Sequence, residues 1–208
     1  MHRRVAIRIA AAAVAAALTL PAAAQTDNPS GKRWVEPPKD IPKAQRGDRT
    51  RNIDFLLGAL KAAPDEDSAK AVEGRIWALW LASGSDTADL LMARVRVAME
   101  EKDYDLAIRL LNAIVEIRPD YVEGWDRRAT VYFLKGDLGR ALADLEEVLK
   151  REPRHFGALA GLGTILSDLG DDKHALEAFR RALAIYPRLD GVADQVKTLS
   201  EKVEGRDI

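Results

Sequence analysis

The sequence has no cysteine, few aromatic residues and no excess of basic charge. Its 208 residues include three histidines, and aromatic residues make up 6% of the chain. Without cysteine, neither a disulfide nor a catalytic thiolate is available, so packing must hold the fold together. Lys and Arg number 32 against 33 Asp and Glu, a balance that argues against a nucleic-acid or anionic-membrane surface. We therefore expect no nucleic-acid partner.

The motifs of common catalytic sites are also lacking. The sequence contains no H-E-x-x-H spacing, no G-x-S-x-G turn and no glycine-rich phosphate loop after a strand. His155 and His174 stand near expected helix starts, where a solvated or capping role is favoured over metal ligation. Gly157, Gly161 and Gly163 are best explained by close packing between helices. The sequence therefore predicts a non-catalytic protein with no cofactor and no metal.

Residues 1–24 have the features of a cleaved secretory signal. A basic opening precedes an alanine-rich apolar run at residues 9–20, and small residues at 22–24 stand before Gln25. The run is too short to span a bilayer comfortably, although an uncleaved anchor is the alternative. Export would place the chain in the periplasm. Removal of three arginines with the signal would leave a net charge near minus four, and we expect no stable membrane insertion afterwards.

One pattern occurs three times between residues 88 and 189, with a period of 34 residues. Four columns keep this period: Pro119, Pro153 and Pro187; Ala107, Ala141 and Ala175; Asp103, Asp137 and Asp171; and Leu111, Leu145 and Phe179. A fixed period of this length is typical of stacked repeats, in which each unit buries its apolar face against its neighbours.

The pattern of each repeat predicts two helices joined by a turn. In the middle repeat, Asp120 is placed to cap a helix with Glu123 at its third position, as in a capping box. Gly136 and Asp137 should end this helix and begin the next, which Pro153 terminates. The acidic residues mostly fall on faces expected to be exposed.

At these positions the chain resembles the tetratricopeptide repeat family, and in particular an exported bacterial member of it. The matching residues are Trp125, Ala129, Tyr132, Ala141, Leu145 and Pro153 in the middle repeat, and Leu159, Gly163, Leu166, Ala175, Phe179, Ala182 and Pro187 in the last. In the first repeat Val95 and Ile114 stand where the family has small residues, and Arg94 and Arg128 occupy a position that is apolar in the family. We therefore expect wider helix spacing or a tilt of the first repeat. The resemblance implies an all-α, right-handed superhelical solenoid of antiparallel helix pairs with a protein-binding surface.

The predicted organisation follows from these signals. After the signal at 1–24, residues 25–51 form a proline-rich flexible lead, and residues 52–87 form an N-terminal helical pair that caps the front of the stack as a degenerate repeat. Three repeats occupy residues 88–121, 122–155 and 156–189. A C-terminal capping helix and tail complete the chain at 190–208, with a dimerisation helix as the alternative.

Three tryptophans outside the repeats need an interpretation. Trp34 is the main apolar feature of the lead, and an incidental position in a linker is favoured over a docking motif. Trp77 and Trp80 lie on a helix that is apolar on several sides, so they are expected in the core rather than on a ligand platform.

In this family the first helix of each repeat lines a concave groove. The outward positions here are Asp89, Met92, Arg96 and Met99, then Glu123, Asp126, Thr130 and Phe133, then Gly157, Ala160, Thr164 and Ser167. The cationic clamp with which some family members grip acidic chaperone tails is not supported, because the last repeat has Ala160 and Gly161 there. The candidate partner-binding residues are Met92, Arg96, Met99, Glu123, Asp126, Arg127, Thr130 and Phe133.

The hypothesised function is that of a non-catalytic adaptor or assembly scaffold in the cell envelope. Its groove would hold a protein segment, either an amphipathic helix or an extended peptide. A small-molecule or glycan binder, for example of cell-wall fragments, is one alternative, although the groove is poor in aromatic residues. A self-associating structural protein is another, and the sequence fixes neither the partner nor the oligomeric state.

Overall fold

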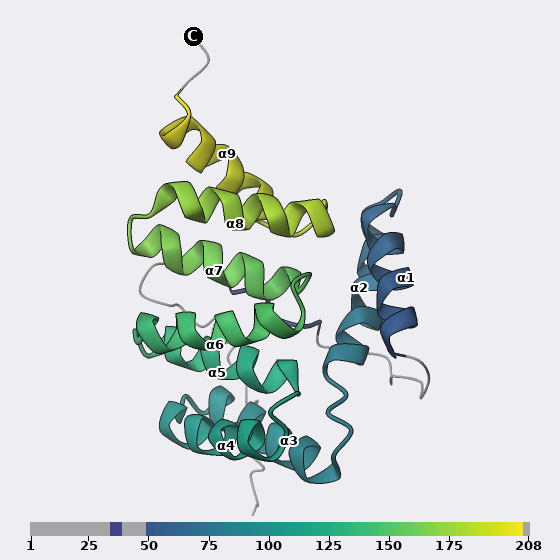
Figure 1. Cartoon of the computed structure of the whole chain (residues 1–208), viewed down its shortest axis with the longest axis vertical. Helices are drawn as coiled ribbons and strands as arrows, with labels where there is room; N and C mark the ends of the chain where they lie inside the picture. Colours follow the sequence, from purple (N-terminus) through teal and green to yellow (C-terminus); the bar gives the residue numbers. More distant parts are fainter. Residues whose placement is uncertain (1–33, 39–48, 206–208) are drawn as a thin grey trace, which may run out of the picture.

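The computed structural model describes residues 34–38 and 49–205, and the regular structure in these ranges is entirely helical (Figure 1). Their nine helices are α1 Arg49–Lys61, α2 Glu66–Trp80, α3 Asp86–Glu100, α4 Tyr104–Ile117, α5 Val122–Leu134, α6 Leu138–Arg151, α7 Phe156–Asp168, α8 Asp172–Ile185 and α9 Val192–Val203. The prediction of an all-α solenoid is confirmed. The predicted signal at 1–24 lies outside the described residues. Among the helices of the described part, none is long and apolar enough to cross a membrane.

Short polar side chains begin most of these helices. In five of them the oxygen of the first flanking residue accepts the backbone N–H three positions later; the five are Asp65, Ser85, Asp103, Asp137 and Asp171. Gly136 and Gly170 have φ angles of 76° and 80°, a left-handed geometry that ends α5 and α7 before the next helix starts. The predicted turns at Gly136–Asp137 and its equivalent are therefore confirmed.

The predicted start of α5 is wrong. Asp120 forms an ion pair with Arg118 at 2.9 Å instead of capping the helix, and the residue that flanks α5 is Tyr121, which makes no capping bond. Glu123 is buried rather than turned back onto the helix start. The capping-box pattern failed because Glu123 has a stronger partner elsewhere in the fold.

Two of the four columns with the 34-residue period, the alanine column and the column of large apolar residues, lie in the core of the stack. Ala107, Ala141 and Ala175 are fully buried, as are Leu111 and Leu145 of the next column. Alanine lets neighbouring helices approach closely, so that α3 to α8 stack in chain order (Figure 1). The period therefore encodes the packing surface of each repeat.

Arg128 is accommodated at its normally apolar position by a buried acid. Its guanidinium donates to both carboxylate oxygens of Asp144 at 2.8 and 2.7 Å, and to the side-chain oxygen of Asn112 at 2.9 Å. Such a bidentate hydrogen bond between a guanidinium and a carboxylate is among the strongest that side chains make. α5 is thereby linked to α6 and to α4.

The N-terminal pair, α1 and α2, does not cap the front of the stack as predicted. Instead it runs along one edge, where the turns between successive repeats gather (Figure 1). The Arg188 guanidinium donates to the Pro64 carbonyl at 2.6 Å, and the Tyr121 hydroxyl donates to the Leu81 carbonyl at 3.0 Å. The pair thus reaches from the turn after α8 to the turn before α5.

Aromatic residues explain why the N-terminal pair takes this place. Trp77 and Trp80 pack on Phe156 at the start of α7, with ring centroids 5.6 and 5.1 Å apart. Their predicted place in the core is confirmed, because both are buried. The front face of α3 is left uncovered by this arrangement, and Leu90 and Val97 are more than half exposed there.

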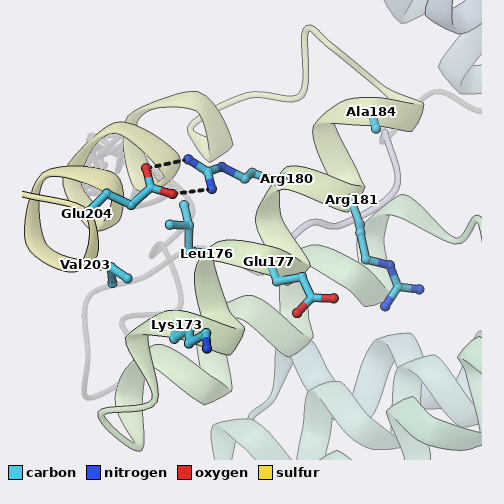
Figure 2. Close-up of a pocket in the computed structure, with 8 residues that line it drawn as sticks. All are labelled: Lys173, Leu176, Glu177, Arg180, Arg181, Ala184, Val203 and Glu204. Atoms are coloured by element: carbon cyan, nitrogen blue, oxygen red, sulfur yellow. Dashed lines mark hydrogen bonds and ion pairs between the residues drawn. The ribbon is translucent and has the colours of Figure 1, made fainter.

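The last helix, α9, packs on α8 at the other end of the stack (Figure 1). Val192 and Leu199 of α9 are buried in the core that they share with α8. Arg180 of α8 forms an ion pair with Glu204 at 2.6 Å across the seam (Figure 2). An open pocket of about 520 Å³ lies along this seam, and mostly charged side chains line it. We interpret this pocket as the space that remains between α8 and the end of α9 where the two helices pack.

Candidate functional site

The inner face of the stack is the side of α3, α5 and α7 that carries the predicted groove residues. On α5, four of these side chains are buried, with exposed fractions between 0 and 4%: Glu123, Asp126, Thr130 and Phe133. Arg127 is half-buried. On α3, Met92 is buried, Met99 is half-buried and Arg96 is exposed. The inner face is therefore covered over α5 and open around Arg96, and partner binding by these eight residues stays a prediction.

Part of the cover comes from the chain itself. The Trp34 segment, residues Trp34–Pro38, lies on the inner face between α5 and α7, and the Trp34 ring packs on Phe133 with centroids 5.2 Å apart. Val35 packs against the neighbouring core cluster around α2 and α7. The interpretation of Trp34 as an incidental linker residue is therefore wrong.

A glycine makes room for the Trp34 ring. A Cβ atom placed on Gly161 would lie 2.6 Å from Cη2 and 2.7 Å from Cζ2 of Trp34, closer than real contacts allow. The hydroxyls of Thr130 and Thr164 donate to carbonyls of their own helices, Asp126 and Ala160, so they need no partner from outside. The seat is therefore small, apolar and shaped for a flat ring.

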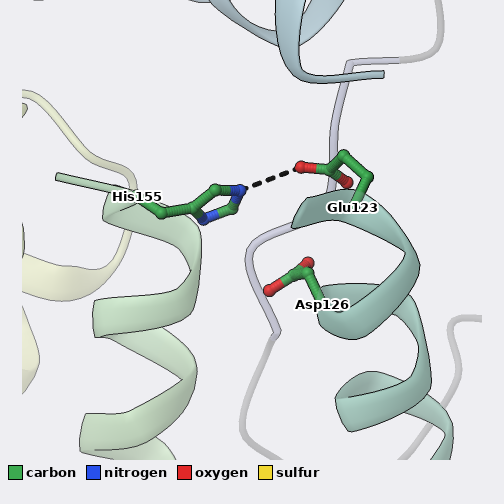
Figure 3. A group of neighbouring side chains, drawn as sticks. All are labelled: Glu123, Asp126 and His155. Atoms are coloured by element: carbon green, nitrogen blue, oxygen red, sulfur yellow. Dashed lines mark hydrogen bonds and ion pairs between the residues drawn. The ribbon is translucent and has the colours of Figure 1, made fainter. Parts of the chain in front are cut away.

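A buried triad of titratable side chains adjoins this seat. Glu123 and Asp126 come from the first turns of α5, and His155 flanks the start of α7 (Figure 3). His155 Nε2 lies 2.9 Å from Glu123 Oε1, and the Trp80 ring stacks on the imidazole with centroids 4.1 Å apart. Each triad residue is at most 1% exposed.

The backbone of α7 determines which ring nitrogen of His155 carries the proton. The Ala158 N–H can only donate, and it points to His155 Nδ1 at 3.0 Å, so Nδ1 must accept. Burial favours a neutral ring and the carboxylates favour a charged one, but a second proton on Nδ1 would face the Ala158 N–H. Because Nδ1 accepts from the Ala158 N–H, the ring carries its proton on Nε2 and donates it to Glu123 Oε1. The predicted capping role is confirmed, whereas the predicted solvation is wrong.

Within the triad, Asp126 lacks the hydrogen bond that joins Glu123 and His155. Neither of its oxygens has a hydrogen-bond donor among the described residues, and the second Glu123 oxygen has Arg127 Nε at 3.7 Å. Burial raises the pKa of Asp126 to about 6, with a further contribution from Glu123 and against the effect of Arg127. The carboxylate of Glu36 in the Trp34 segment acts in the same direction. Negative charge therefore gathers beside the seat.

The triad does not fit a divalent metal, although its ligand atoms lie within 4.8 Å of one another. A metal on Nε2 would need its proton removed and moved to Nδ1, where metal-bound histidines normally donate to an acceptor. Here Nδ1 faces the Ala158 N–H, which is a donor. We therefore expect Nε2 to keep its proton and its hydrogen bond to Glu123.

Sequence reasoning placed Glu123 and Asp126 on the inner face but missed that they are buried. It also missed their junction with His155, because the 32 residues that separate Glu123 from His155 hide the contact. Two signals were available: an acid pair three positions apart on one helix face, and a histidine in the equivalent turn of the next repeat. Neither reveals the Trp80 ring that covers them.

Comparison with known proteins supports the repeat architecture. The pattern of the tetratricopeptide repeat family matches residues 127–189. A TPR repeat-containing protein of Rhizobium etli is 41% identical over 155 residues, which are 74% of this chain and 76% of that protein. The DnaJ homolog subfamily C member 3 of Gallus gallus is 25% identical over 154 residues, and the match spans 29% of its length.

Solved structures give the same picture. The Sgt2 TPR domain of Aspergillus fumigatus is 26% identical and superposes with a TM-score of 0.54, over 58% of this chain and 81% of that one. The first TPR of Spaghetti (RPAP3), solved with the HSP90 peptide SRMEEVD, is 18% identical with a TM-score of 0.55, over 58% of this chain and 95% of that one. The second likeness concerns the fold.

Proposed function

Because the chain belongs to the tetratricopeptide repeat family, we propose that it is a non-catalytic protein-interaction module whose inner face holds an extended segment of a partner protein. The observation that carries this proposal is the Trp34 segment itself, which lies on α5 and α7 without helical or strand structure. Proline at 37 and 38 favours extended geometry in the residues before each of them. A face that accepts this segment can accept one from a partner, as the TPR domain solved with an HSP90 peptide does.

The open part of the inner face supplies a second contact. Arg96 is exposed on α3, and Met99 is half-buried one turn further along the same helix. An exposed cation beside a thioether side chain suits a segment that continues from the apolar seat into an acidic or polar residue. We therefore propose that a partner lies across α3, α5 and α7.

We also propose that the mature chain acts as an adaptor or assembly scaffold in the periplasm. Support comes from the sequence at 1–24, with its basic opening, apolar run and small residues before Gln25. Intact mass of the protein recovered from a bacterial envelope fraction tests the point. A chain beginning at Gln25 is expected, and a chain that retains Met1 would contradict export with cleavage.

Affinity capture with paired variants tests the interaction surface. Arg96→Glu reverses the exposed charge of the inner face, while Arg181→Glu makes the same reversal at an exposed site on α8. We expect envelope proteins held by the unsubstituted chain to be held by the α8 variant and released by the α3 variant, with both variants equally helical by circular dichroism. Equal capture by both variants would contradict binding at the inner face.

A further inference from the structure

We infer that the Trp34 segment is a built-in, weak competitor for the inner face, and that the face selects partner segments with an aromatic residue for the Gly161 seat, an aliphatic residue next and a basic residue third. This inference rests on the proposed function and adds the chemistry of the partner. Its three positions correspond to Trp34, Val35 and Glu36.

The first position is defined by shape. The Trp34 ring occupies the place where any side chain at Gly161 would begin, and Phe133 packs against its tilted face. Aromatic pairs in such offset or tilted arrangements are favourable beyond the area they bury. Replacing the ring by a small side chain would leave the seat unfilled, so an aromatic residue is required there.

The second position is defined by the apolar surface beside the seat. Val35 is half-buried and packs on the core cluster that contains Trp77, Trp80 and Leu159. Alternate side chains of an extended segment point to opposite sides, so two adjacent apolar residues can engage two different clusters. Trp34 reaches the cluster of α5 and α6, and Val35 reaches the one around α2 and α7.

The third position is defined by charge, and here the chain's own segment is poorly matched. Glu36 is exposed, and its carboxylate adds negative charge to the surroundings of the buried Asp126, which has no hydrogen-bond donor among the described residues. The other groups near Asp126 are Arg127, which offsets part of this charge, and His155, whose two ring nitrogens are engaged by Glu123 and by the Ala158 N–H. A lysine or arginine at the third position would replace a like-charge contact by an attractive one. A partner with this residue should therefore displace the Trp34 segment.

Peptide binding in trans tests the inference on the full mature chain. The probe is a fluorescein-labelled peptide with the sequence of residues 32–40, followed by fluorescence anisotropy. An attached segment competes at an effective concentration on the order of millimolar. We expect the Trp34→Ala chain to bind the peptide at least about tenfold more tightly than the unsubstituted chain, because its own competitor is weakened.

Two altered peptides test the selectivity. A peptide with lysine in place of Glu36 should bind the Trp34→Ala chain about tenfold more tightly than the original, and this gain should fall in high salt. A peptide with alanine in place of Trp34 should not bind. Equal binding of all three peptides, or equal affinity of both chains for the original peptide, would overturn the inference.

A matched pair of glycine substitutions locates the seat. In the Trp34→Ala chain, Gly161→Ala should abolish peptide binding, whereas Gly139→Ala, at an exposed site in α6 with nothing within 4 Å, should leave it unchanged. Loss of binding in both variants, or in neither, would contradict the placement of the aromatic residue at Gly161.

If the Arg96→Glu variant loses its envelope partner while no peptide binds, the proposed function stands and this inference fails. If peptides bind in the expected order while Arg96→Glu captures normally, the inference about the seat stands and the surface around Arg96 is wrong.

Discussion

The indole ring of Trp34 lies against the backbone of Gly161, more than a hundred residues further along the chain. A Cβ on Gly161 would stand 2.6 Å from the ring, so the two positions cannot both carry a side chain without movement. Phe133 of α5 packs on the same ring, with centroids 5.2 Å apart. The contact joins a segment outside the repeats to two helices of the repeat stack, and it shows how the inner face receives a flat side chain.

Unfolding free energies should reveal this contact as coupling between the two residues. In a Trp34→Ala background, Gly161→Ala should stabilise the chain by up to about 1 kcal/mol, because alanine is the better helix former and the space is free. In the unsubstituted chain the same change should give no gain or a loss of about 1 kcal/mol, because the ring is expelled. Urea unfolding of the four chains measures both values. Equal effects of Gly161→Ala in the two backgrounds would mean that the ring does not occupy the seat.

Asp126→Asn should stabilise the protein above pH 6. The pKa of Asp126 is about 6 when folded and 3.8 in its ordinary state, so the folded chain favours the protonated form, which asparagine imitates. Ionised Asp126 therefore costs stability above pH 6, and the cost declines as the pH falls from 6 towards 3.8. We expect a gain of about 1 to 3 kcal/mol at pH 7.5 that shrinks towards zero near pH 4.

Asp144→Asn is the control for this experiment. Asp144 is also buried, but both its oxygens accept hydrogen bonds from Arg128. Its replacement should destabilise the chain by about 1 to 3 kcal/mol, because the guanidinium loses its anionic partner. Thermal denaturation of the three chains across pH 4 to 8 measures both effects. Destabilisation by Asp126→Asn at pH 7.5 would refute the absence of a donor at Asp126.

His155→Ala should be among the most damaging substitutions. It removes the donor of the buried Glu123, the acceptor of the Ala158 N–H and the ring stacked on Trp80, at a combined cost of about 3 kcal/mol or more. Asp171→Ala removes a helix cap and a solvent-accessible contact with the His174 ring, and it should cost about 1 kcal/mol. Chemical denaturation compares the two. Similar costs would show that His155 serves as a cap and little else.

Gly163 should tolerate no larger residue. A Cβ there would lie 2.8 Å from two ring atoms of Phe179, and both residues are buried between α7 and α8. Gly163→Ala should therefore destabilise by about 1 to 3 kcal/mol through overpacking. Gly58→Ala, at an exposed site in α1 with nothing within 4 Å, should instead stabilise by up to about 1 kcal/mol. Thermal melts that move in the same direction for both would contradict the close approach at Gly163.

The repeat stack could be predicted from the sequence because its information is local and periodic. Ala107, Ala141 and Ala175 recur every 34 residues, and each marks a place where two helices meet. Gly136 and Asp137 define a turn by their own backbone and side-chain preferences. Such signals need no knowledge of distant parts of the chain.

The covering of the inner face could not be predicted, because it depends on contacts between distant segments. Trp34 lies outside the periodic pattern, and its ring has room only because Gly161 has no side chain. Trp80 was expected in a core, but its helix gives no sign that its partner is His155 in a turn of another repeat. Glu123 has the spacing of a surface residue, and only the fold brings a donor to it.

The central claim, that the inner face holds residues 34–38 of the chain itself, is tested most directly by a distance distribution. The absence of native cysteine allows two spin labels to be attached without other changes, on Glu36→Cys in the segment and Glu177→Cys on the exposed side of α8. Double electron–electron resonance should give one narrow distribution in this chain, and a broad one once Gly161→Ala is added. A broad distribution before that substitution would contradict the account, because the segment would then not be seated on the inner face.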